Sequence, residues 1–266
     1  MQVKTLSQKA LKVINDYSNF TIGNASCSVP YFNNKKIKNR AGLRAQIGKG
    51  RPQEIREELE IILKKNKIDL EQISNENLKK ILVDNNIGIE CSGFVFHVLD
   101  AEAQSRNLGS IARKIHFINC HGIIGQIRCA IRPIENCDVS TFANDKNSIR
   151  VKIQDIRPGD IVTMMGNGAD DMRNHILIIK EVEYENNIPK SFSYAHAIAY
   201  PEDGIYGSGI RQGKIILSDL SADLDSQQWL PENNTSTNLL KNYKNKYKIE
   251  IRRPRFLSWL QSPRFS

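Results

Sequence analysis

The stretch HILIIKEVEYENNIPKSFSYAHAIAY, residues 175–200, decides the fold class. It contains two runs of β-type residues, 175–184 and 191–199, which are separated by the turn-forming segment ENNIPK. This pattern predicts a hairpin of two antiparallel strands. Similar short runs, separated by turn residues, lie at 159–164, 210–217 and 246–252. We therefore expect an antiparallel sheet in the second part of the chain.

The first part of the chain has the pattern of helices. Apolar residues recur at spacings of three and four in 51–70, in 71–86 and in the segment that begins at Cys91. Ser74 is a suitable N-cap for the second of these helices. Residues 1–20 are typical of a further amphipathic helix. Helices followed by antiparallel strands predict an α+β fold rather than an alternating α/β fold.

No internal repeat and no low-complexity linker divides the 266 residues. We expect a single domain over 1–266, with 32–88 as a helical insertion or subdomain. Residues 101–148 are expected to be irregular, and 221–245 to form a polar loop. The segment RRPRF, residues 252–256, is typical of an edge strand with outward arginines.

The composition excludes several classes of protein. The chain carries 38 Lys and Arg against 29 Asp and Glu, a net charge of +9. The basic residues are scattered and form no usual nucleic-acid-binding motif, so we expect a solvated basic face and no nucleic-acid partner. No run of about 18 apolar residues is present, so no membrane span is expected. The first residues lack the apolar block of a secretory signal, which predicts a cytoplasmic protein unless a precursor segment is missing or the protein is exported by another route.

The five cysteines are odd in number, which argues for reduced thiols rather than a disulfide framework. One segment contains side chains that zinc accepts as ligands: His116, Cys120, His121, Cys129 and Cys137. It has no C-x-x-C pair, however, and its gaps are longer than those of zinc modules. We therefore expect buried thiols there and no metal.

Cys91 is the candidate nucleophile. It opens its predicted helix in GIECSGFVFHVLD, residues 88–100. The N–H groups and positive dipole of a helix N-terminus lower the pKa of a thiol and can bind an oxyanion. A thiol catalyst also needs a base, and His175 opens the apolar run HILIIKEV. His196 lies in the next strand of the hairpin, where antiparallel pairing can bring it beside His175 as an orienting group.

These segments resemble the signature motifs of the NlpC-type cysteine peptidases, which have a papain-like fold. ECSGFVFHVL is similar to the family's DCSGFV motif around the nucleophile, and IRPGDIV is similar to its LRPGDLVFF motif. HILIIKEV resembles the HVGIYIG strand that carries the base, and YAHAI resembles the IHA strand that carries the third residue. VPYFNN is similar to the PYVWGG motif that precedes the cysteine. The segments follow the order of the family over residues 29–200.

The resemblance implies a papain-like fold in which N-terminal helices pack on an antiparallel, partly barrel-like sheet. It implies that Cys91 attacks an amide or peptide carbonyl, that His175 is the base and that His196 orients it. Tyr31 matches a tyrosine that aids positioning or oxyanion binding. The expected activity is hydrolysis through a thioester, with no cofactor, in a monomer that acts on a peptide or peptidoglycan-type substrate. Two alternatives are an inactive papain-fold binding or scaffold protein and an acyltransferase that uses the same three residues.

Overall fold

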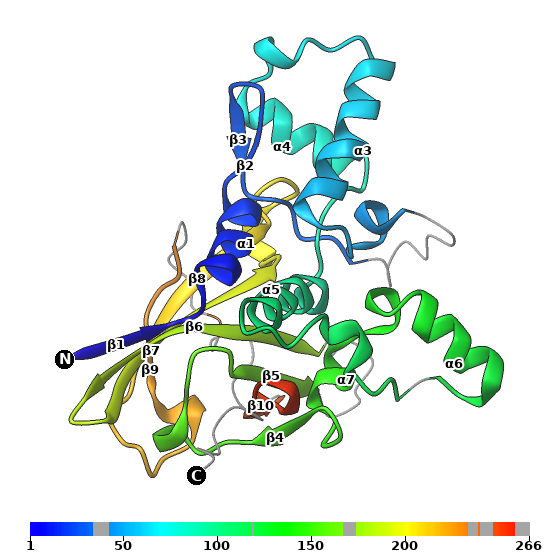
Figure 1. Ribbon diagram of the computed structural model, residues 1–266. Coiled ribbons are helices and arrows are strands. Elements are labelled where there is room, and N and C mark those ends of the chain that lie inside the picture. Colours follow the sequence, from blue (N-terminus) through cyan, green and yellow to red (C-terminus); the bar gives the residue numbers. More distant parts are fainter. Residues whose placement is uncertain (34–42, 119, 167–173, 234–238, 240–246, 259–266) are drawn as a thin grey trace.

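Figure 1 shows the protein as a computed structural model, which describes residues 1–33, 43–118, 120–166, 174–233, 239 and 247–258. Helices pack on a curled antiparallel sheet shaped like half a barrel, so the predicted α+β class is confirmed. The helices are α1 (Gln8–Ser18), α3 (Pro52–Lys65), α4 (Asn75–Asp84), α5 (Cys91–Ser105), α6 (Gly122–Ile131), α7 (Val139–Ala143) and α9 (Arg255–Ser258). Single 3-10 turns are η1 (Arg44–Ile47), η2 (Leu70–Gln72), η3 (Ile111–Arg113), η4 (Ile134–Asn136), η5 (Ile153–Asp155), η6 (Pro201–Asp203) and η7 (Leu224–Ser226).

The strands form one large sheet and one small hairpin. The large sheet has the order β4-β10-β5-β6-β7-β8-β9, and β1 also pairs with β6. All of its pairs are antiparallel. Its strands are β1 (Gln2–Thr5), β4 (Ser148–Arg150), β5 (Ile161–Gly166), β6 (His175–Glu185), β7 (Ile188–Ile198), β8 (Gly209–Ile216), β9 (Gln228–Trp229) and β10 (Tyr247–Pro254). The small hairpin pairs β2 (Phe20–Ile22) with β3 (Ala25–Cys27).

The predicted hairpin is formed by β6 and β7. Asn186 and Asn187 join the two strands and have φ values of 51° and 64°. Positive φ at both residues of a two-residue loop is typical of a type I′ turn, and asparagine tolerates this conformation better than most residues. The loop is shorter than the predicted ENNIPK connection, so β7 begins at Ile188 rather than at residue 191.

The large sheet has a hydrophobic core on each face. Along β6, Ile176 and Ile178 belong to a core that also contains residues of α1, α3, α4 and α5, which we call the helix-side core. Leu177 and Ile179 belong to a second core inside the curled sheet, which we call the barrel core. The alternation follows from the period of two in a strand. A strand that is buried on both faces explains the continuous apolar run in HILIIKEV.

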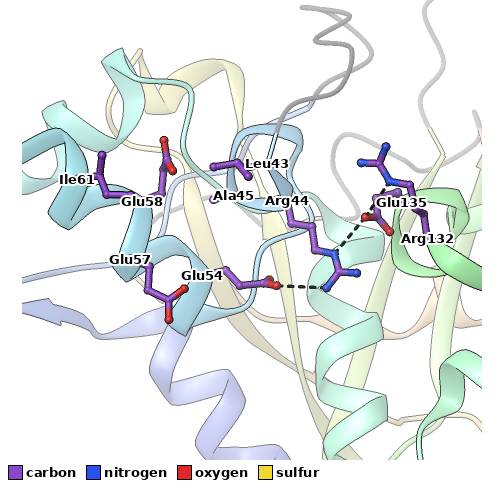
Figure 2. Close-up of a pocket in the computed structure, with 9 residues that line it drawn as sticks. All are labelled: Leu43, Arg44, Ala45, Glu54, Glu57, Glu58, Ile61, Arg132 and Glu135. Atoms are coloured by element: carbon purple, nitrogen blue, oxygen red, sulfur yellow. Dashed lines mark hydrogen bonds and ion pairs between the residues drawn. The ribbon is translucent and has the colours of Figure 1, made fainter.

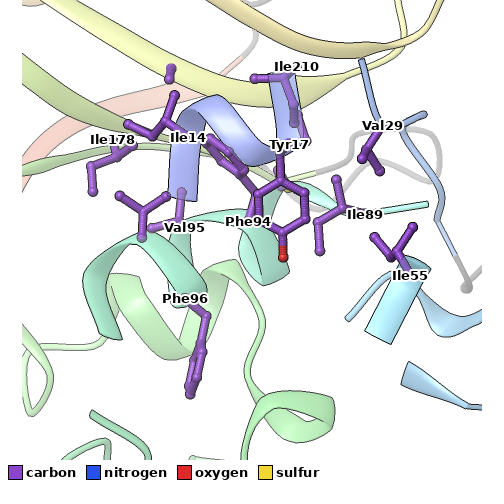
Figure 3. Packing of buried hydrophobic residues seen from close by; sticks show 14 of the residues in the cluster. Ile14, Tyr17, Val29, Ile55, Ile89, Phe94, Val95, Phe96, Ile178 and Ile210 are labelled. Carbon is purple, nitrogen blue, oxygen red and sulfur yellow. The ribbon is translucent and has the colours of Figure 1, made fainter. Parts of the chain in front are cut away.

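Helix α5 is the central helix of the helix-side core (Figure 3). It packs against α1 on one side and against β6 and β7 on another. The ring of Tyr17 on α1 meets Phe94 edge to face at a centroid distance of 5.6 Å. The Tyr17 hydroxyl donates to the carbonyl of Gly50 at 2.7 Å. These contacts join the segment before α3 to α5. The predicted domain limits, with 32–88 as an insertion, stay a prediction.

The prediction for the arginines near residue 252 is wrong. β10 is not an edge strand, because β4 pairs with one of its sides and β5 with the other. Arg252 is buried, donates to the Ser148 hydroxyl at 2.8 Å and forms ion pairs with Glu250 and Asp145. Acidic and polar partners make this burial possible: Glu250 lies on the same strand, and Asp145 and Ser148 come from a distant part of the chain.

Three further predictions need correction. Residues 1–20 do not form one helix, because Gln2–Thr5 pairs with β6 as β1 before α1 begins. Residues 101–148 are not simply irregular, since they contain α6 and α7. The predicted loop 221–245 contains η7 and β9 in its described part, while 234–238 and 240–246 lie outside the described residues.

Candidate active site

Cys91 lies at the tip of α5, as predicted. It is the first residue of the helix and follows Glu90, which has extended backbone angles of −90° and 164°. Its side chain is buried between α5 and the first residues of β6. The backbone N–H groups of Ser92 and Ile176 act on the sulfur as hydrogen-bond donors. The thiol therefore lies at the junction of α5 with β6.

The electrostatics at the thiol differ from the prediction. Burial, and then the charge of Glu90, raise the pKa of Cys91 to about 12. Lys49 and the two backbone N–H groups lower the pKa, but they do not compensate. The prediction of a lowered pKa is wrong because it considered the helix N-terminus and left out burial. At neutral pH the sulfur carries its proton, and a thiolate forms only when a base removes it.

A buried lysine organises the residues on either side of Cys91. Lys49 Nζ lies 2.5 Å from Glu90 Oε1 and donates to the Ser92 hydroxyl at 2.8 Å and to the carbonyl of Cys137 at 2.6 Å. Burial by itself lowers the pKa of Lys49, but Glu90 raises it, and the net pKa is above its ordinary value. Lys49 is therefore an ammonium that fixes both neighbours of the cysteine through charge-assisted bonds.

His175 and His196 meet in the structure and continue to a third group. His175 Nε2 lies 2.7 Å from His196 Nδ1. His196 Nε2 lies 2.9 Å from Oε1 of Glu232, which follows β9. All three residues are at most 3% exposed. We call this chain of three side chains the imidazole relay.

Glu232 is the functional candidate that sequence reasoning missed. Besides His196, it accepts from the hydroxyl of Tyr194 at 2.7 Å and from that of Tyr200 at 2.6 Å. Burial alone raises the pKa of Glu232, but His196 and the two hydroxyls lower it, and the net pKa is below its ordinary value. The group is therefore a carboxylate. The one signal in the sequence was the apolar pair Trp229-Leu230 shortly before it, in an otherwise polar segment.

The bonds of the relay determine where its protons lie. A carboxylate only accepts, so His196 donates to Glu232 from Nε2. The tautomer of His196 that donates from Nε2 accepts at Nδ1, and His175 then donates to it from Nε2. Burial, and then His196, hold the pKa of His175 well below its ordinary value, so this ring is neutral. Nδ1 of His175 is then the basic nitrogen of the relay.

The relay and the thiol lie on opposite faces of the sheet. His175 is directly opposite Met164 in the β5–β6 ladder, and Met164 belongs to the barrel core. His196 lies between Ala195 and Ala197, which belong to the helix-side core with Cys91, so its own side chain points the other way. Among the described residues, no hydrogen bond joins the Cys91 thiol to either imidazole.

The prediction that Cys91, His175 and His196 converge at one point therefore holds only for the two histidines. The physical reason is the period of two in a strand, because a shift by one residue exchanges the two faces. HILIIKEV is apolar on both faces, so its pattern does not show which face carries His175.

The structure places Tyr31 beside the entry to α5. Its backbone forms a parallel bridge with Ile89, two residues before the cysteine. Phe32 N donates to the carbonyl of Ile89 at 3.1 Å, and Ile89 N donates to that of Pro30 at 3.0 Å. The Tyr31 hydroxyl accepts from Asn33 Nδ2 at 3.4 Å. The backbone of residues 30–32 thus pairs with the residues that immediately precede Cys91.

Other candidate sites are separate from these residues. A pocket of 520 Å³ opens beside η1 and α3, where Arg44 pairs with Glu54 and Glu135 (Figure 2). No predicted site residue lines it. In the described part of the chain, no three His, Cys, Asp or Glu side chains gather as a metal site. Cys120 and Cys129 form a disulfide, so the expectation of five reduced thiols is wrong for this pair.

Comparison with known proteins gives no match to a family model, to a curated protein or to a solved structure. None of the helices in the described ranges has the length and apolar character that crossing a bilayer requires.

Proposed function

We propose that the protein is a cysteine hydrolase of the papain-like, NlpC-type kind, which cleaves an amide bond in a peptide of the cell-wall type. The observation that carries the proposal is the imidazole relay. Three titratable side chains in one hydrogen-bonded chain are costly to bury, and such groups gather at functional sites. A relay that fixes the basic nitrogen of one imidazole is what a thiol nucleophile needs, and Cys91 lies at the other face of the same strand.

The proposed reaction has two steps. Cys91 attacks the carbonyl carbon while its proton passes to Nδ1 of His175, and the backbone N–H groups at the tip of α5 stabilise the oxyanion. His175 returns the proton to the amine as the C–N bond breaks, which leaves a thioester on the sulfur. Water then attacks the thioester with His175 as the base, and the acid product and the free thiol result.

This reaction requires a rearrangement at the start of β6. His175 is the first residue of the strand, and the N–H of the next residue, Ile176, already faces the thiol. The proposal requires a change in the backbone angles at residues 174 and 175 that turns Nδ1 of His175 toward α5 while Nε2 keeps its bond to His196. In this proposal the structure described here is the closed, resting form, in which the thiol keeps its proton.

The second candidate function is a binding or scaffold protein without catalysis. The opposite faces of the thiol and the relay favour it, as does the raised pKa of Cys91. An acyltransferase would follow the same first step, with an amine in place of water in the second step. Added amine nucleophiles separate transfer from hydrolysis by the products that they form.

The deciding experiment traps the thioester. The full chain is mixed with peptidoglycan fragments and peptide libraries, quenched in acid and analysed by intact mass. We expect an acyl adduct on the wild type, none on Cys91→Ala, and a rate of adduct formation about 10²–10⁴-fold lower in His175→Ala. His196→Gln should keep more activity than His196→Ala, because an amide can still bond to both neighbours in the relay.

The matched control is His116→Ala, since His116 is exposed and has no part in the relay. It should leave the rate of adduct formation unchanged. A second measurement follows alkylation of Cys91 by iodoacetamide as a function of pH. If wild type and His175→Ala give the same pH profile, and no adduct forms, the thiol and the relay are uncoupled and the scaffold function replaces the hydrolase.

A further inference from the structure

Helix α6 carries an apolar face that no described residue covers. Four isoleucines are 54–85% exposed: Ile123, Ile124, Ile127 and Ile131. The one buried residue of the helix is Cys129. Figure 1 shows α6 projecting at the right of the molecule, away from the large sheet. Exposed isoleucines in such a group are unusual on the surface of a soluble domain and mark an interaction site.

The four isoleucines share one side of the helix. At about 100° per residue they span an arc of roughly 100°, and Cys129 lies on the opposite side. The helix is therefore attached to the molecule by the side that carries Cys129, which is also joined to Cys120 by the disulfide. The opposite side presents a continuous aliphatic stripe to the surroundings.

The segment of sequence that carries this stripe is basic. Between Glu102 and Glu135 the sequence contains no acidic residue, but it contains five Lys and Arg. Two of the five, Arg106 and Arg132, pair with those flanking glutamates. Arg113, Lys114 and Arg128 are exposed and form no ion pair with any described residue. Arg128 lies on α6 at the edge of the isoleucine stripe, at about 140° from Ile123.

We propose that α6 docks on a lipid surface that carries anionic headgroups. The helix lies in the plane of the interface, with the isoleucines among the acyl chains and the basic residues at the headgroups. The absence of acidic residues over this segment gives the charge complementarity that an anionic surface requires. The stripe is convex and aliphatic and lacks the aromatic anchors that are enriched at protein interfaces, which favours lipid over a protein partner. The proposal does not depend on the chemistry at Cys91.

The test is co-sedimentation of the full chain with vesicles. One set contains phosphatidylcholine alone, and the other contains equal parts of phosphatidylcholine and phosphatidylglycerol. We expect binding to the anionic vesicles, at least tenfold weaker binding to the neutral ones, and weaker binding as salt is added. Ile124→Ser with Ile127→Ser should weaken binding by at least about tenfold. Arg128→Gln with Lys114→Gln should reduce the salt dependence.

Ile205→Ser is the matched control, because Ile205 is 74% exposed and lies outside α6. It should bind like the wild type. The proposal is overturned if the wild type does not bind anionic vesicles, or if the isoleucine pair can be replaced without loss of binding. It is also overturned if the chain forms dimers that the isoleucine substitutions dissociate and shows no affinity for either vesicle, since the stripe then covers a second copy.

Discussion

The two faces of β6 hold polar groups in opposite ways. On the helix side, Cys91 is surrounded by fixed charges, the ammonium of Lys49 and the carboxylate of Glu90. On the barrel side, two imidazoles form a hydrogen-bonded chain to a single carboxylate, which also accepts from two tyrosine hydroxyls. One strand of the sheet thus separates the ion pair near Cys91 from the hydrogen-bonded imidazole relay. Groups that lie on the two sides of one strand therefore need not share an electrostatic environment.

The strongest way to break the barrel side is to remove its acceptor. Glu232→Ala leaves the hydroxyls of Tyr194 and Tyr200 and the N–H of His196 without their partner. A buried donor without an acceptor costs about 1–3 kcal/mol, so we expect a loss of about 5 kcal/mol in the free energy of unfolding. Urea unfolding followed by circular dichroism measures it. Glu60→Ala, at an exposed position, should change the stability by less than about 0.5 kcal/mol.

Acid should destabilise both faces through their buried histidines. Burial lowers the pKa of His97 from 6.5 to about 3, and burial and His196 lower that of His175. The unfolded chain therefore binds more protons below pH 6.5, and stability falls as the pH drops. We expect a loss of roughly 1.4 kcal/mol per pH unit for each histidine, measured by urea unfolding between about pH 6 and pH 5. His97→Gln should halve this slope, and an unchanged slope would contradict the assignment.

A smaller change tests whether the lack of a side chain at Gly213 is needed to place the Tyr194 hydroxyl that donates to Glu232. Gly213 lies opposite Tyr194 in the β7–β8 ladder, and a Cβ atom at Gly213 would lie 2.4 Å from the Tyr194 hydroxyl oxygen. Gly213→Ala should displace the hydroxyl from Glu232 and cost about 1–3 kcal/mol. In a Tyr194→Ala background the same substitution should cost much less, which a double-mutant cycle by urea unfolding measures. Equal costs in both backgrounds would mean that Gly213 does not serve the relay.

The electrostatics on the helix side can be tested by removing one of the charged groups next to the thiol. Glu90 raises the pKa of Cys91, so Glu90→Gln should lower that pKa and speed the alkylation of Cys91 at neutral pH. Each unit of pKa corresponds to about a tenfold change in thiolate fraction. Lys49→Met should slow alkylation, because Lys49 lowers the pKa of the thiol. Site-resolved mass spectrometry gives both rates, and a change of the same sign in both variants would refute this account of the charges.

Local signals explain what could be predicted from the sequence. Ser74 accepts from Asn77 N at 3.2 Å as the N-cap of α4, and Pro52 begins α3, so neighbouring residues define these helices. The hairpin and the position of Cys91 at a helix tip follow in the same way. The face of His175 could not be predicted, because both faces of β6 are apolar. Glu232 could not be predicted either, since its three donors come from strands and loops more than 30 residues away.

The place of β10 in the sheet affects how the chain matures during synthesis. Arg252 bonds to Ser148, and 104 residues separate them in the chain. At roughly 5–20 residues per second, a ribosome needs roughly 5–20 s to make the intervening segment. Until then, β4 and the outer side of β5 are unpaired edges on a nascent polypeptide, and such edges invite aggregation. Chaperones that cover β4 and β5 in this interval are therefore expected to raise the yield of folded protein.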